Sequence, residues 1–168
     1  MKLDDFENRL GHARAAYRYF AASLPPEAAF NVGAVRVGDF ECAKKSQRES
    51  MLIELGWAFF VRFDAVLEVF LIECSVQVGG QKLFEWAKAS GKFSEHELRG
   101  IEQYRDLRNT LHHDDGQPDP NRRKTLDVSE QHEPQFLEGH MEDWANLFLK
   151  IGRVASGNAA AETDAPRG

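Results

Sequence analysis

The chain has 168 residues, a formal net charge of −6 and 42% hydrophobic residues. That length fits one domain, which buries enough surface to fold without a disulfide or a metal ion. The excess of acidic side chains argues against a protein that coats nucleic acid non-specifically, because such binding depends on many Lys and Arg contacts to phosphate. The same charge balance still allows a small basic cleft.

The N-terminus and the cysteines predict a cytoplasmic protein. Residues 1–7 are acidic where a secretory signal is basic and then apolar, so we expect no export. Cys42 and Cys74 lie far apart and do not form a C-x-x-C pair, which favours a reducing compartment over a metal or redox site. The apolar stretch 51–78 is long enough to span a bilayer, but charged side chains interrupt it, and we expect a soluble helix and no membrane contact.

Apolar spacing predicts two helices in the first half of the chain. Residues 3–20 carry apolar side chains at steps of three and four, which predicts an amphipathic helix that ends near Pro25. Residues 27–45 are punctuated by glycine and permit a short irregular hairpin, from which we predict no larger sheet. Residues 46–78 predict a long apolar helix, either central in a bundle or packed on a second copy, with Gly79-Gly80 as its stop.

Two further helices are expected between these glycines and a polar loop. Residues 81–89 predict a short third helix. Ser94 and Glu97 have the spacing of a capping box, which predicts a fourth helix from there to about His113. Residues 114–134 are rich in Asp, Gly and Pro and predict a long loop.

The last helix completes the predicted fold. Apolar residues between Phe136 and Ile151 mark this helix, and residues 155–168 predict a disordered tail because they are small and polar. We therefore predict an all-α fold, an up-and-down bundle of four to five helices over residues 1–154, with a short irregular hairpin permitted between the first two helices.

Residues 104–113, in the predicted fourth helix, hold most of the chemically suggestive side chains. On a helical wheel the apolar residues face the bundle, and the adjoining polar strip presents two guanidiniums, a carboxamide and an imidazole. His113 lies about 40° further around the helix from Asn109. A permanently charged planar group beside a proton carrier is what binding or cutting a phosphodiester requires. The residues of the strip are Arg105, Arg108, Asn109 and His112.

The run from Arg108 to His113 resembles the motif of the HEPN superfamily. These domains are helical bundles, and their ribonuclease members carry an arginine, then a polar residue, then a histidine after a gap of four to six residues. Here Arg108 and Asn109 precede His113 with a gap of four, and Arg105 precedes His112 with a gap of six. The motif covers ten residues, while the predicted helical layout fits nearly the whole domain.

The resemblance implies a metal-independent endoribonuclease that works as a homodimer, without a cofactor, and that cuts RNA and not DNA. The motif helices of two protomers would meet in a shared cleft. His113 would move protons during attack of the ribose 2′-hydroxyl, and Arg108 would neutralise charge on the phosphorus. Asn109 would hold a phosphate oxygen or orient the histidine, and Arg105 and His112 would be additional substrate-binding residues.

The implied setting is a toxin, an antiphage effector or a stress response, with an antitoxin or regulatory protein as a further partner. One departure concerns the toxins that are paired with nucleotidyltransferase antitoxins. Many of these have a tyrosine two residues after the motif histidine, where the partner modifies them. This chain has Asp115 after His113 and Asp114 after His112, which puts regulation by that modification in doubt.

Other interpretations of these residues stay open at this level. Arg105 and Arg108 are also consistent with a solvated or ion-paired helix face, with Asp106, Glu102 or acidic residues of the second helix as partners. The histidines are consistent with contacts to the last carbonyls of the helix. Asp64 and Glu68, on the polar stripe of the second helix, are candidates to support the motif histidine. A metal site is not predicted, because neighbouring residues point apart on a helix. The competing functions are an inactive HEPN-like module that dimerises or binds a nucleotide or a partner, and a helical regulatory subunit.

Overall fold

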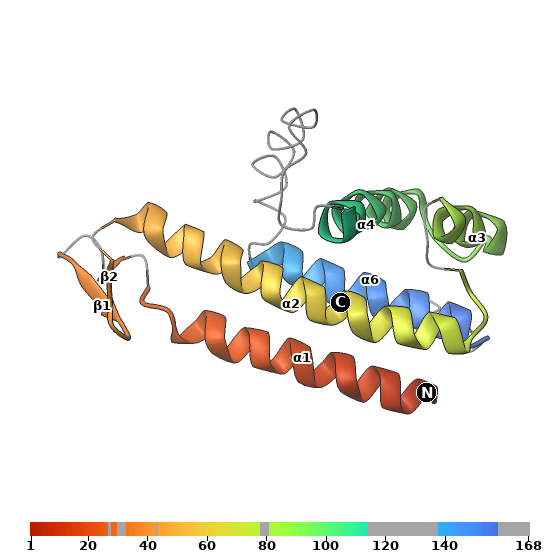
Figure 1. Ribbon diagram of the computed structural model, residues 1–168, viewed down its shortest axis with the longest axis horizontal. Coiled ribbons are helices and arrows are strands. Elements are labelled where there is room, and N and C mark those ends of the chain that lie inside the picture. The colour runs from red at the N-terminus through yellow and green to blue at the C-terminus, as the bar shows by residue number, and fades with distance from the viewer. Residues whose placement is uncertain (27, 30–32, 43, 78–80, 114–137, 158–168) are drawn as a thin grey trace, which may run out of the picture.

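The computed structural model describes residues 1–26, 28–29, 33–42, 44–77, 81–113 and 138–157. Over these ranges the chain is an all-α bundle of five helices with one two-stranded hairpin, as predicted (Figure 1). The predicted loop at 114–134, the Gly79-Gly80 stop and most of the predicted tail lie outside the described residues. The elements are α1 (Leu3–Ser23), β1 (Val35–Val37), β2 (Phe40–Cys42), α2 (Lys45–Glu73), α3 (Lys82–Ser90), α4 (Glu95–His113) and α6 (Glu138–Ala155).

The second helix ends earlier than the apolar pattern predicts. The pattern continues to residue 78, whereas α2 stops at Glu73. Ser75 has a φ of +59°, and the N–H of Val76 donates to the carbonyl oxygen of Leu71 at 2.9 Å, so the chain turns back on the helix end. The side chain of Val76 is buried in the core, although Val76 lies in the turn after α2 and not in the helix.

The connection between α1 and α2 contains the hairpin that its sequence permits. Strands β1 and β2 pair antiparallel, with Val35 opposite Cys42 and Val37 opposite Phe40. Gly38 has a φ of +59°, a conformation that costs glycine little and other residues more. Within the described ranges, no helix has the length and hydropathy that crossing a bilayer requires.

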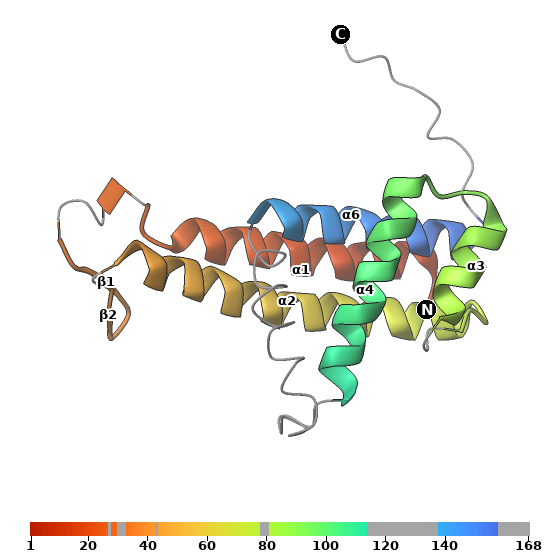
Figure 2. The ribbon, with the colours of Figure 1, turned by 90° about the horizontal axis from the view of Figure 1, so that it is seen from above.

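Three long helices, α1, α2 and α6, pack against one another so that each contacts the other two, and α4 lies across two of them. In Figures 1 and 2, α1, α2 and α6 run along the length of the molecule, while α4 crosses over α2 and α6. Helix α1 is antiparallel to α6, because Arg18 pairs with Glu142 near one end of α6 and Glu7 pairs with Arg153 near the other. The second half of α4 crosses the C-terminal half of α2, where Asp64 and Glu68 lie, and its last turn extends beyond α2 (Figure 2).

Aromatic rings hold the crossing point of α2, α4 and α6. The ring centroid of Phe60 lies 6.1 Å from that of Tyr104 and 5.4 Å from that of Trp144, and the Tyr104 ring lies 4.9 Å from Phe148. Edge-on pairs of this kind add about 0.5–1.5 kcal/mol each beyond the area that they bury. Tyr104 therefore fixes the second half of α4 against the bundle.

The first turn of α4 is fixed by the predicted capping box. The N–H of Glu97 donates to Ser94 Oγ at 3.3 Å, and the N–H of Ser94 donates to Glu97 Oε2 at 2.7 Å. Lys150 of α6 also donates to Glu97 Oε1 at 2.6 Å. Two of the backbone N–H groups at this helix end are thus satisfied, and the same glutamate ties α4 to α6.

Two glycine-to-alanine substitutions should have opposite effects on stability. A Cβ at Gly152 would lie 2.8 and 2.9 Å from ring atoms of Phe6 and closer still to a third, and Phe6 is itself stacked on Phe70 at 4.4 Å. Gly152→Ala should therefore cost about 1–3 kcal/mol despite the better helix propensity of alanine. At Gly11 nothing lies within 4 Å, so Gly11→Ala should stabilise α1 by about 0.5–1 kcal/mol.

Urea unfolding of the two variants and the parent measures both effects. The Gly11 variant serves as the control for helix propensity alone. Equal stabilisation by the two substitutions would contradict the close packing of α6 on α1.

Candidate functional site

The candidate site is built where α4 crosses α2. Tyr104 and Arg108 are four residues apart on α4, and Asp64 and Glu68 are four residues apart on α2, so each pair lies on one face of its helix. The two faces meet. We call these four residues the Arg108 cluster.

Hydrogen bonds link all four members of the Arg108 cluster. The hydroxyl of Tyr104 donates to Asp64 Oδ1 at 2.5 Å, and Arg108 Nε donates to the same oxygen at 3.2 Å. Arg108 also donates from Nη2 to Glu68 Oε1 at 2.5 Å. The guanidinium of the predicted motif is therefore held between two carboxylates of α2.

The members of the Arg108 cluster differ in their exposure to solvent. The side chain of Asp64 is 5% exposed, that of Arg108 14% and that of Glu68 34%. A buried carboxylate is costly unless it is paired and hydrogen-bonded, and Asp64 receives both a hydroxyl and a guanidinium. Glu68 keeps contact with water, so its ion pair with Arg108 is more easily exchanged for another anion.

Burial and charge shift two pKa values in the cluster. Burial, followed by the negative charge of Asp64 and the hydrogen bond to it, raises the pKa of Tyr104 well above its usual value. Burial alone lowers the pKa of Arg108, but the oxygens of Tyr104, Asp64 and Glu68 raise it by more, and the net direction is upward. At neutral pH Tyr104 is a neutral donor and Arg108 a fixed cation.

Arg105 lies elsewhere on α4 and has other partners. Its Nη2 is 2.9 Å from Asp106 Oδ1 and 3.8 Å from Glu102 Oε1. Both acids belong to α4 itself and are about half exposed. The ion-paired interpretation of the sequence describes the contacts of both arginines, because Arg105 pairs within α4 and Arg108 pairs with acids of the second helix. Arg105 and Arg108 do not share a partner among these contacts.

The other predicted site residues are placed only by their backbone. Asn109, His112 and His113 belong to the last turns of α4, and their side chains lie outside the described part of the chain. Their roles stay predictions. In the described ranges, no three His, Cys, Asp or Glu side chains come together in a way that could hold a metal ion.

Sequence reasoning identified the Arg108 cluster only in part. It left acids of the second helix open as partners of the arginines or, for Asp64 and Glu68, of the motif histidine, and the structure has both on Arg108. Their contact with the histidine stays a prediction. Tyr104 was assigned only to the apolar face of its helix, although its hydroxyl binds Asp64. The available signal was Asp64 itself, a carboxylate between Phe63 and Ala65 in the apolar stretch of α2.

Comparison of the chain with protein-family models, with curated proteins and with solved structures gives no match. The resemblance to HEPN domains therefore rests on the motif and the helical layout.

The two arginines of α4 should differ in what they contribute to stability. Arg108→Met should lower the free energy of unfolding by roughly 2–4 kcal/mol, because Asp64 and Glu68 lose a shared cation and Asp64 is buried. Arg105→Met removes only pairs with half-exposed acids and should change it by less than about 1 kcal/mol. Urea denaturation at neutral pH measures both. Similar losses for the two variants would refute the structural role assigned to Arg108.

Proposed function

We propose that the protein is a metal-independent endoribonuclease of the HEPN type, with Arg108, Asn109 and His113 at its catalytic centre. The observation that carries this proposal is the anchoring of Arg108 by Asp64 and Glu68. An arginine that stabilises a transition state must be held in one orientation before the substrate arrives. Two of its five N–H donors make the anchoring bonds, which leaves three for phosphate oxygens.

The proposed reaction begins at the ribose 2′-hydroxyl. His113 takes the proton of this hydroxyl, and the oxygen attacks the adjacent phosphorus. Arg108 stabilises the negative charge on the phosphorane, and Asn109 holds a phosphate oxygen or the imidazole. The 5′-oxygen leaves with a proton that the protonated His113 returns or that water supplies, so the products are a 2′,3′-cyclic phosphate and a 5′-hydroxyl. Arg105 and His112 bind the flanking chain.

The proposed shared cleft needs a second copy, and the exposed face of α2 supports one. Val61, Val69 and Ile72 are 46%, 51% and 64% exposed, and with Ala58 and Ala65 they follow one stripe of the helix. Exposed apolar stripes of this kind mark interaction surfaces. An antiparallel pairing of two α2 helices about Ala65 would place both α4 helices on the same side of the interface, with the two Arg108 residues close to the dyad.

A second candidate is a non-catalytic module that dimerises or binds a partner. The observation in its favour is charge: the Arg108 cluster contains two carboxylates and one guanidinium, so its described groups carry a net −1. In this case Arg108 has only a structural role.

The setting proposed for the catalytic protein is a toxin, an antiphage effector or a stress response with a regulatory partner.

Cleavage of RNA in the presence of EDTA tests the enzyme directly. The parent protein should cut RNA and leave 2′,3′-cyclic phosphate ends, and His113→Ala should cut at least about a hundredfold more slowly. Arg108→Ala should lose activity to a similar degree. An RNA with 2′-deoxyribose at the cut site should not be cleaved there. Product ends are identified by mass spectrometry.

His12→Ala is the matched control, since His12 is an exposed histidine on α1. Its rate should equal that of the parent. Equal cleavage by all of these proteins would show a contaminating nuclease and would defeat the enzyme in favour of the non-catalytic module.

A charge in the α2 stripe should dissociate the proposed dimer. Val61→Glu places a carboxylate on each side of the interface and should raise the dimer dissociation constant by about a hundredfold or more. Tyr19→Glu makes the same change at a 72% exposed apolar residue of α1 and should leave it unaltered. Sedimentation equilibrium measures both. A parent that stays monomeric, or equal effects of both changes, would exclude this interface.

A further inference from the structure

The two carboxylates that hold Arg108 are unequal. Asp64 is 5% exposed and accepts hydrogen bonds from both Tyr104 and Arg108 Nε, so it cannot leave without stranding a buried charge. Glu68 is 34% exposed and binds the guanidinium at a different nitrogen, Nη2. Only the Glu68 contact can be broken at low cost, because water can solvate the released carboxylate.

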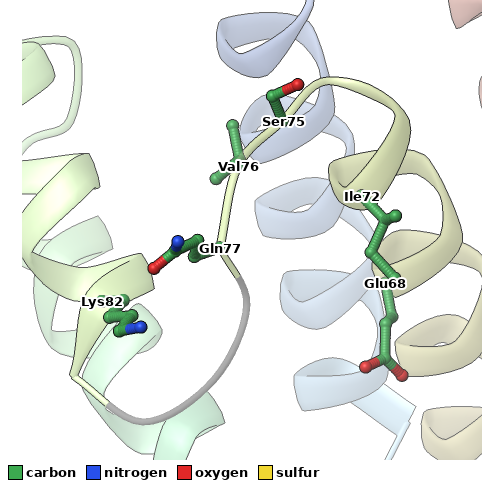
Figure 3. A pocket seen from close by; sticks show the side chains of 6 residues that line it. All are labelled: Glu68, Ile72, Ser75, Val76, Gln77 and Lys82. Carbon is green, nitrogen blue, oxygen red and sulfur yellow. The ribbon is translucent and has the colours of Figure 1, made fainter.

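Glu68, the more exposed of the two carboxylates, also lines a pocket. Glu68 lines a pocket of about 450 Å³ between the end of α2 and the start of α3, together with Ile72, Ser75, Val76, Gln77 and Lys82. Figure 3 shows Glu68 and Ile72 on the α2 side of this pocket and Gln77 and Lys82 across from them. A group in the pocket therefore has Glu68 on one side and a cation and an amide on the other.

We propose that Glu68 is a displaceable counter-ion and that a phosphate group of the RNA takes its place on Arg108, while Asp64 keeps the guanidinium in position. Glu68 connects the pocket, which it lines, with Arg108 Nη2, which it binds, and Lys82 is the second cation for the phosphate. The link to cleavage rests on the proposed function, but the exchange itself is a binding event. Glu68 thus lowers the affinity for RNA, and Asp64 is a positioning residue.

This exchange accounts for the charge of the Arg108 cluster. With both carboxylates bound, Arg108 attracts a phosphate weakly, because the cluster is net negative. Once Glu68 has turned to solvent, one carboxylate and one guanidinium remain, and a phosphate oxygen can accept the bond that Glu68 accepted. Removing the charge of Glu68 should accordingly strengthen RNA binding, which is the opposite of what damage to the fold would do.

The experiment measures binding of a fluorescent 2′-O-methyl RNA, which has no free 2′-hydroxyl to attack, to the full-length protein by anisotropy. Glu68→Gln keeps an oxygen that can accept from Nη2 and should bind about tenfold more tightly than the parent. Glu54→Gln removes the same charge from an exposed residue of the same helix and should change binding by less than about twofold. Lys82→Gln should weaken binding.

The Arg108 pathway is isolated by a double-mutant cycle. In an Arg108→Gln background, Glu68→Gln should no longer tighten binding, because the nitrogen that it frees is absent. A gain that persists without Arg108, an equal gain from Glu54→Gln, or no measurable binding by any variant would overturn the proposal.

The outcome is separable from that of the nuclease proposal. If RNA binding follows this pattern but ordinary RNA is not cleaved, the nuclease proposal is refuted and the exchange of Glu68 for phosphate is supported. If RNA is cleaved but Glu68→Gln does not tighten binding, the nuclease proposal is supported and the exchange is refuted.

Discussion

The burial of one carboxylate at a helix crossing determines how the rest of this structure is arranged. Asp64 lies in the middle of α2, where nearly all neighbours that face the core are apolar, and it is the one charged residue that is fully buried in the described ranges. An ion in such a place costs several kcal/mol unless donors surround it. Tyr104 and Arg108 supply these donors from α4, so α4 must cross α2 at this point. The apolar contacts of Tyr104 with Phe60 and Phe148 then make the crossing rigid.

The same interaction gives Arg108 two roles that compete. The fold uses its charge to neutralise Asp64, and the proposed reaction uses its charge to neutralise a phosphate. One guanidinium can do both only if it has donors to spare and if one of its carboxylates can leave. Arginine meets the first condition through its five N–H groups in a fixed fork, which a lysine would not provide. Glu68 meets the second, because it is partly exposed beside an open pocket.

The sequence predicted the helices of the described part of the chain because their signals are local. The prolines after α1, the Ser94 and Glu97 capping box and the apolar spacing of α2 each act within a few residues, and the structure has all three. The apolar pattern did not predict the early end of α2, because Val76 is buried from a turn and not from the helix. The packing of Val76 depends on residues that are distant in sequence. The hairpin was permitted by the pattern but not fixed by it, since three-residue strands carry little periodicity.

The site was predicted only in part, for the same physical reason. Arg108 was identified from its spacing to Asn109 and His113, which is a property of one helix. Its partners Asp64 and Glu68 lie on another helix, 44 and 40 residues away, and only the crossing angle of α4 decides which motif side chain they meet. A pattern along one chain segment cannot give that angle. It follows that the net charge around Arg108 depends on Asp64 and Glu68 of α2 as much as on the motif itself. This net charge is also what separates the two proposed functions, a nuclease and a non-catalytic binding module.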